Sequence, residues 1–231
     1  MKRFYRDAAA CSEAGGHGIL LDGKSLKSPA GKRFLLPSAA LAEAIATEWR
    51  DQGEKIVPVT MPLMQLAATA IDRVTEARAE TVATVAGFGA TDLLCYRAES
   101  PRELVERQER LWQPLVDWAR LHLDAPLVVV AGVVPRPQPR EALKAIEAAV
   151  AALDAFRLTA LASATGAAGS VILGLALIER RLPAIEVYEL SQLDESFQIE
   201  KWGEDAEAAR RRADLKAEIE AAEQFLTLLE A

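Results

Sequence analysis

The sequence predicts an α+β fold, in which a small mixed α/β N-terminal domain with antiparallel strands precedes a larger all-helical C-terminal domain. Short apolar runs alternate with glycine-containing turns as far as Leu36, which is typical of a small antiparallel sheet. From Asp92 onward, apolar residues recur mostly at helical spacing over long segments. We therefore expect the N-terminal domain to span residues 1–90 and the helical domain residues 91–231, with ample apolar material for a core.

Turn signals and helix caps define the N-terminal elements. Three short strands are expected to form an antiparallel meander, at residues 18–22, 25–28 and 33–36. Asp22-Gly23 between the first two strands is a hairpin signal. Ser38 is a suitable N-cap for a helix that ends near Gly53. The remainder of the domain is expected to contain one strand and two helices, at residues 55–59, 62–74 and 78–88.

Helical periodicity dominates the C-terminal part. It predicts helices at residues 101–122, 140–153, 155–166, 169–181 and 184–202, and a last one from residue 204. Pro114 should kink the first of them, and the apolar, β-branched run 126–134 is expected to be extended. Residues 158–178 carry no charge and are long enough to cross a bilayer. Their many small residues instead favour two buried helices with a break at 165–170.

Charge and cysteine content argue against several classes of function. The formal net charge of −7 argues against a basic surface for nucleic acid or anionic lipid, so neither partner is expected. Cys11 and Cys95 are far apart and lack metal-type spacing, which suits a reducing compartment. The basic start of the chain is not followed by the apolar stretch that a signal peptide needs, so no secretion signal is expected.

The sequence contains no pattern typical of a catalytic, cofactor or metal site. His17 lies in the glycine-rich segment 15–18, but the Lys-Ser/Thr ending of a phosphate-binding loop is absent. A flexible entry to the first strand is the simpler interpretation of this segment. His122 ends a predicted helix, where a cation favours the helix dipole. A small-molecule or nucleotide-binding enzyme of unknown reaction remains the alternative function.

The helix expected at residues 184–202 has two apolar faces. One face is an ordinary stripe formed by Val187, Leu190, Leu193 and Phe197. The opposite side carries Tyr188, Ile199 and Trp202, and Glu195 lies among them at the same helical phase. A second apolar face must pack either inside its own domain or against a partner.

The same region carries a family resemblance. Leu193-Asp194-Glu195-Ser196-Phe197-Gln198, followed by Trp202-Gly203, resembles the C-terminal signature of the chaperones that assemble the catalytic head of the F-type ATP synthase. The similar branch is the one that acts on the alpha subunit, of mitochondrial and alphaproteobacterial type. Other matching segments follow the family's order along nearly the whole chain: Lys2-Arg3-Phe4-Tyr5, Leu21-Asp22-Gly23-Lys24, Ser28-Pro29, Glu48-Trp49, Met61-Pro62-Leu63, Ala70-Ile71-Asp72-Arg73, Thr91-Asp92-Leu93-Leu94, and Gln108 with Trp112.

This resemblance implies a non-enzymatic chaperone that needs no cofactor. Its partner would be the free alpha subunit, which it would keep from aggregating until beta subunits replace it. The partner-binding residues are then expected to be Glu195, Trp202, Tyr188, Ile199, Asp194 and Gln198. Glu195 could pair with an arginine of the client, or it could tie two helices of its own domain. A cytoplasmic location in a bacterium is expected, as against the mitochondrial matrix for eukaryotic relatives.

Overall fold

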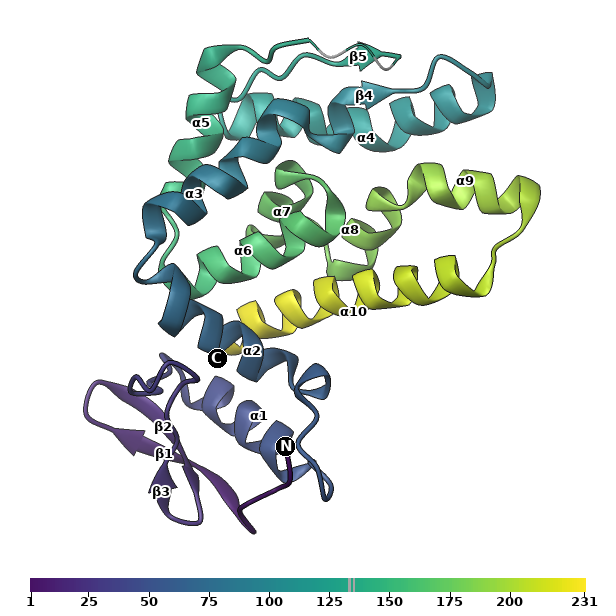
Figure 1. Ribbon diagram of the computed structural model, residues 1–231. Coiled ribbons are helices and arrows are strands. Elements are labelled where there is room, and N and C mark those ends of the chain that lie inside the picture. Colours follow the sequence, from purple (N-terminus) through teal and green to yellow (C-terminus); the bar gives the residue numbers. More distant parts are fainter. Residues whose placement is uncertain (133, 135) are drawn as a thin grey trace. The chain divides into compact units, whose positions relative to one another are not determined.

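The computed structural model describes residues 1–132, 134 and 136–231 (Figure 1). The chain forms two compact units. The N-terminal unit consists of residues 1–78, 154–160 and 221–231. The helical unit consists of residues 79–153 and 161–220. A small antiparallel sheet near the N-terminus and the preponderance of helices confirm the predicted α+β class. The expected boundary between residues 90 and 91 stays a prediction.

The sheet of the N-terminal unit has three antiparallel strands in the order β1-β2-β3. They are β1 (Ala8–Glu13), β2 (Gly16–Leu21) and β3 (Lys24–Ser25). The sequence did not suggest β1, because its residues are mostly small and not β-branched. The strand expected at 33–36 is wrong, since its two ends each form only a single bridge, to Lys27 and His17. The turn at Asp22-Gly23 is confirmed, with φ values of 48° and 76°.

Helix α1 (Ala39–Arg50) packs along the sheet (Figure 1). Ser38 caps it as predicted, because its hydroxyl accepts a hydrogen bond from the Leu41 amide at 3.1 Å. Leu41 and Ile45 are fully buried. The strand expected at 55–59 is wrong: Lys55 forms an isolated bridge with Lys2, and a 3₁₀ turn, η1, spans Pro58–Thr60.

The N-terminus of helix α2 (Pro62–Thr69) is capped by Glu48, a residue of α1. The carboxylate of Glu48 accepts hydrogen bonds from the amides of Leu63 and Met64, both at 2.8 Å. These amides are among those a helix start leaves without an internal partner. Burial nevertheless raises the pKa of Glu48 to about 7, because desolvation penalises the charged form more than the two hydrogen bonds favour it.

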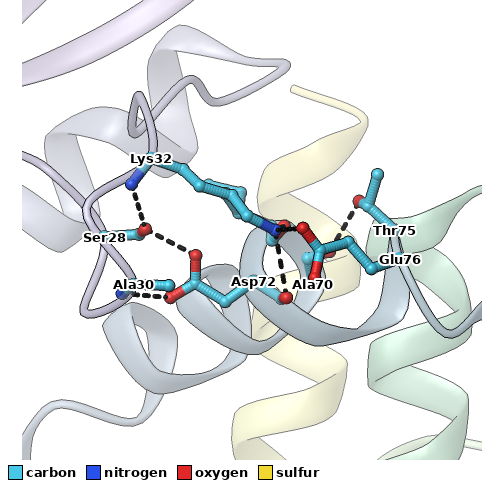
Figure 2. Close-up of polar contacts among 8 residues, drawn as sticks. Ser28, Ala30, Lys32, Ala70, Asp72, Thr75 and Glu76 are labelled. Atoms are coloured by element: carbon cyan, nitrogen blue, oxygen red, sulfur yellow. Dashed lines mark hydrogen bonds and ion pairs between the residues drawn. The ribbon is translucent and has the colours of Figure 1, made fainter.

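A π-helical turn, η2 (Ala70–Val74), continues α2 and is held by polar contacts from the 28–32 turn (Figure 2). Asp72 accepts hydrogen bonds from the Ser28 hydroxyl and from the Ala30 amide, the latter at 2.9 Å. The Lys32 ammonium donates to the Ile71 and Asp72 carbonyls, each at 3.1 Å, and pairs with Glu76 at 2.7 Å. Asp72 therefore has a structural role, because it ties the 28–32 turn to the end of α2.

The helical unit is built mainly from helices, with one small parallel strand pair. Its elements are α3 (Arg78–Gly87), η3 (Phe88–Thr91), η4 (Leu93–Cys95), β4 (Tyr96–Arg97), α4 (Arg102–His122), β5 (Val130–Ala131), α5 (Arg140–Ala151), α7 (Val171–Ile178), α8 (Ala184–Ser191) and α9 (Leu193–Trp202). Helices α6 (Ala155–Ala168) and α10 (Ala206–Leu229) contribute residues to both units. Of the extended run expected at 126–134, only β5 is a strand, and Val133 lies outside the described residues.

The break expected inside the uncharged segment 158–178 is confirmed between α6 and α7. Gly169 adopts a φ of 67°, and Ser170 caps α7 by accepting a hydrogen bond from the Leu173 amide at 3.0 Å. Buried Asp92 accepts from the Ser170 hydroxyl at 2.8 Å and from the Ile172 amide at 3.2 Å. Among the residues that the structure describes, no helix is both long enough and apolar enough to span a membrane.

Candidate partner-binding surface

Helices α8 and α9 are separate, so the single helix expected at residues 184–202 is wrong. The break falls at Gln192, whose φ and ψ are −104° and 18°. The indole nitrogen of Trp112 donates to the Leu190 carbonyl at 3.0 Å, which satisfies a backbone acceptor next to the break. Tyr188 on α8 therefore does not share a helical phase with Ile199 and Trp202 on α9.

Two charge pairs fasten α9 to α4. Arg107 donates twice to Glu200, at 2.7 and 2.9 Å, and Lys201 donates to Glu103 at 3.0 Å. Both cations also lie over the ring of buried Phe197, at 5.3 Å for Arg107 and 5.2 Å for Lys201. These contacts fix the orientation of α9 about its own axis within the helical unit.

Asp194 belongs to the inner side of α9. Its carboxylate accepts a hydrogen bond from the Gln108 amide at 2.7 Å. Burial raises the pKa of Asp194, although the hydrogen bond from Gln108 and the charge of Arg97 act in the opposite direction. Asp194 therefore stabilises the packing of α9 on α4, and its side chain is engaged within the unit.

The outer side of α9 presents Glu195, Gln198 and Trp202, which follow one another at i, i+3 and i+7. All three are exposed, and Trp202 has 79% of its surface accessible. Ile199 is half-buried beside them. We call Glu195, Gln198, Ile199 and Trp202 the α9 face. An indole this exposed contributes little to folding and is a typical anchor of a binding surface.

Glu195 differs from the other charged residues of its helix. Asp194, Glu200 and Lys201 all bond to side chains of α4. Within the described part of the chain, Glu195 has no hydrogen bond or ion pair. No contact among the described residues therefore supports the alternative in which Glu195 ties two helices of its own domain. Its carboxylate remains available to a cation beside Trp202.

Tyr188 is held by a residue that the sequence did not single out. Arg212 on α10 donates to the Tyr188 hydroxyl at 3.2 Å, to Ser196 at 3.1 Å and to Glu204 at 3.3 Å. Its guanidinium thus joins α8, α9 and the segment before α10. Arg212 is half-buried, although it ends a run of three arginines at 210–212 that is surrounded by acidic residues. Only tertiary contacts distinguish it from Arg211, which is exposed.

The two histidines that the sequence analysis considered, His17 and His122, make contacts within the fold. His17 pairs with Leu36 through two backbone hydrogen bonds, of 2.9 and 2.8 Å. A Cβ at Gly18 would lie 2.3 Å from a carboxylate oxygen of Glu13, so the Glu13 side chain packs directly over this glycine. His122 contacts Glu179 at 2.6 Å and stacks on Trp118 with a centroid distance of 5.5 Å.

Comparisons with known proteins identify the class of protein first. The family model described as "ATP12 chaperone protein" matches residues 2–120, which is more than half of the chain. The chain therefore belongs to the ATP12 chaperone family, and the predicted family is confirmed. The α9 face lies outside the matched segment.

Individual relatives extend this likeness over almost the whole chain. The chain is 28% identical over 214 residues to mitochondrial atp12 of Schizosaccharomyces pombe, covering 87% of this chain and 74% of that protein. The crystal structure of Atp12 from Paracoccus denitrificans matches with a TM-score of 0.93 and 42% identity, covering 99% of this chain and 98% of that one. A putative chaperone of Agrobacterium tumefaciens gives the same TM-score and identity, over 99% of this chain and 86% of that one.

Proposed function

We propose that the protein binds the free alpha subunit of the F-type ATP synthase head and keeps it from aggregating until beta subunits replace it. Membership of the ATP12 chaperone family supports a chaperone role. The observation that carries the proposal is the α9 face. There the Trp202 indole, which is 79% exposed, lies on the same side of the helix as the unpaired carboxylate of Glu195. A subunit separated from its neighbour exposes apolar surface, and such surface aggregates unless it is covered.

The chemistry of the α9 face suits holding followed by release. Trp202 offers apolar contact area, and Glu195 offers a charge-assisted partner to an arginine or lysine of the client. Such a mixed surface can bind with moderate affinity and yield to a larger native interface. Neither role requires a catalytic group or a cofactor, and we propose that the protein is not an enzyme. We place it in the cytoplasm of a bacterium.

Co-production of the alpha subunit without beta tests this function. Tagged protein should retain the alpha subunit in a pull-down and should raise the fraction of alpha that remains soluble. Trp202→Ala should weaken alpha binding roughly tenfold, as expected for an aromatic anchor. Leu121→Ala is the matched control, because Leu121 is 75% exposed on another helix of the same unit. It should leave binding within about twofold of the unmodified protein.

Charge variants test the role of Glu195. Glu195→Lys should weaken alpha binding more than Glu195→Gln does, because it adds repulsion to the loss of the ion pair. The matched control is Glu147→Lys on α5, an exposed acid with the same change of charge. If the unmodified protein fails to retain alpha even when alpha is overproduced, the proposed function is wrong. If alpha binds and both Glu195 variants bind it equally well, only the assignment of Glu195 is wrong.

A further inference from the structure

A groove in the N-terminal unit lies beside the edge strand β3. Its volume is about 340 Å³. The residues that line it include Phe4, Tyr5, Leu21, Lys24, Leu26 and Lys27. Two segments that carry the family resemblance, the one at residues 2–5 and the one at residues 21–24, meet here. The α9 face does not include any of these residues.

Phe4 is an exposed aromatic side chain with a defined support. It is 63% exposed, whereas Tyr5 next to it is only 5% exposed. The Phe4 and Tyr5 rings contact edge to face at 5.4 Å, and Tyr5 contacts buried Trp49 in the same manner at 5.4 Å. The Tyr5 hydroxyl also donates to the Trp49 carbonyl at 2.6 Å. This row of rings connects Phe4 to the core, so its side chain is held at the groove instead of moving freely.

The charge of the groove is positive, although the whole chain has a net charge of −7. Lys24 and Lys27 are exposed and have no ion pair or hydrogen bond from their side chains in the described residues. The single acid of the lining, Asp22, is already engaged. Its carboxylate accepts hydrogen bonds from the amides of Arg6 at 3.0 Å and Asp7 at 2.9 Å, and these bonds lower its pKa.

We propose that this groove binds an extended acidic segment of a partner polypeptide that inserts an apolar side chain. The apolar side chain would contact Phe4 and Leu26, and flanking carboxylates would pair with Lys24 and Lys27. Two unpaired lysines beside an exposed ring complement such a segment in both charge and polarity. The proposal concerns a second surface and does not rest on the identity of the client at the α9 face.

A synthetic peptide tests the proposal directly on the full chain. The probe is a fluorescein-labelled peptide with the core Asp-Leu-Phe-Asp, and its control carries Asn in place of both Asp residues. Anisotropy titrations at low salt should show binding of the acidic peptide that weakens as salt is added. The amide resonances of Tyr5, Leu26 and Lys27 should shift in the ¹⁵N-labelled protein, while those of the α9 face should not.

Variants of the groove decide the outcome. Phe4→Ala should weaken peptide binding roughly tenfold, and Lys24→Glu or Lys27→Glu by about threefold or more. Lys144→Glu on α5, an exposed lysine with the same change of charge, should change it less than twofold. Absence of peptide binding, or binding that Phe4→Ala and Lys24→Glu leave unchanged, would overturn the proposal. Dimerisation of the chain that Phe4→Ala abolishes would overturn it as well, because a second copy would then occupy the groove.

Discussion

Adjacent residues on one helix can have opposite roles, as Asp194 and Glu195 show. The sequence places both in the same motif, but adjacent side chains on a helix point about 100° apart. Asp194 accepts a hydrogen bond from Gln108 on α4 at 2.7 Å. Glu195 lies on the exposed side and has no partner in the described part of the molecule. Stability and binding are therefore expected to depend on different members of the pair.

Alanine substitutions should separate these two roles. Asp194→Ala removes the acceptor of a half-buried hydrogen bond and should lower the free energy of unfolding by about 1–3 kcal/mol. Glu195→Ala should change it by less than about 0.5 kcal/mol, because the side chain is exposed. Urea unfolding followed by circular dichroism measures both values. Equal losses in the two variants would mean that Glu195 makes contacts within the folded chain.

At the scale of elements, the position of α9 depends on its neighbours. On one side of α9, Glu200 and Lys201 form ion pairs with residues of α4. On another side, Arg212 of α10 donates a hydrogen bond to Ser196 at 3.1 Å. The same guanidinium lies 5.9 Å from the Tyr188 ring centroid and so joins α9 to α8. The α9 face is therefore presented by an element with several fixed attachments, which is what a preorganised binding surface requires.

Arg212→Ala should loosen α9, and Arg211→Ala should not. The first variant removes donors to three groups, whereas Arg211 is exposed and serves as the matched control. We expect faster hydrogen–deuterium exchange in residues 193–204 and a loss of about 1–2 kcal/mol of stability for Arg212→Ala only. Unchanged exchange in that variant would show that the pairs with α4 suffice to fix α9.

Helix α7 approaches α6 closely at Gly174. A Cβ at this position would lie 2.5 Å from the Thr165 hydroxyl oxygen and 2.8 Å from a methyl carbon of Leu161. Gly174→Ala should therefore lower stability by about 1–3 kcal/mol through overpacking. Gly166→Ala on α6 is the matched control, since nothing lies within 4 Å of its added methyl group. It should raise stability by roughly 0.5–1 kcal/mol because alanine favours the helix. Thermal unfolding of the two variants should shift in opposite directions.

At the scale of the whole molecule, half-buried Glu48 and fully buried Asp92 make stability depend on pH. Burial raises the pKa of Glu48 to about 7 and that of Asp92 to about 6, although both accept backbone hydrogen bonds at helix starts. Each carboxyl is more easily protonated in the folded than in the unfolded chain. Their contribution to stability is therefore full below the unfolded pKa and declines as pH rises toward the folded value.

Glu48→Gln should remove part of this pH dependence. The unfolded pKa of glutamate is near 4.5 and the folded value is about 7, so the folded state binds more protons between these limits. Over that interval the free energy of unfolding of the unmodified protein should fall, relative to the variant, by about 1–3 kcal/mol. Urea unfolding at several pH values from 4.5 to 7.5 measures the difference. A difference that stays constant over this range would contradict the raised pKa.

The sequence by itself determined the class of the fold, several helix ends and the family. Ser38 and the Asp22-Gly23 turn were identified because capping and turn formation depend on neighbouring residues alone. Long helices such as α4 and α5 follow from periodicity that extends over several turns. The family follows from short segments that keep their order along the chain.

Tertiary structure decided what local patterns cannot encode. Strand β1 exists because residues 8–13 pair with residues 16–21, although their own preference for a strand is weak. The helix predicted at 184–202 breaks at Gln192, where Trp112 bonds the Leu190 carbonyl. That break separates Tyr188 from the α9 face, and contacts from α4 and α10 select Glu195 and Trp202 as the exposed residues. Pairing and packing between distant segments override local preference, because they satisfy backbone groups and bury surface that no single segment can satisfy or bury alone.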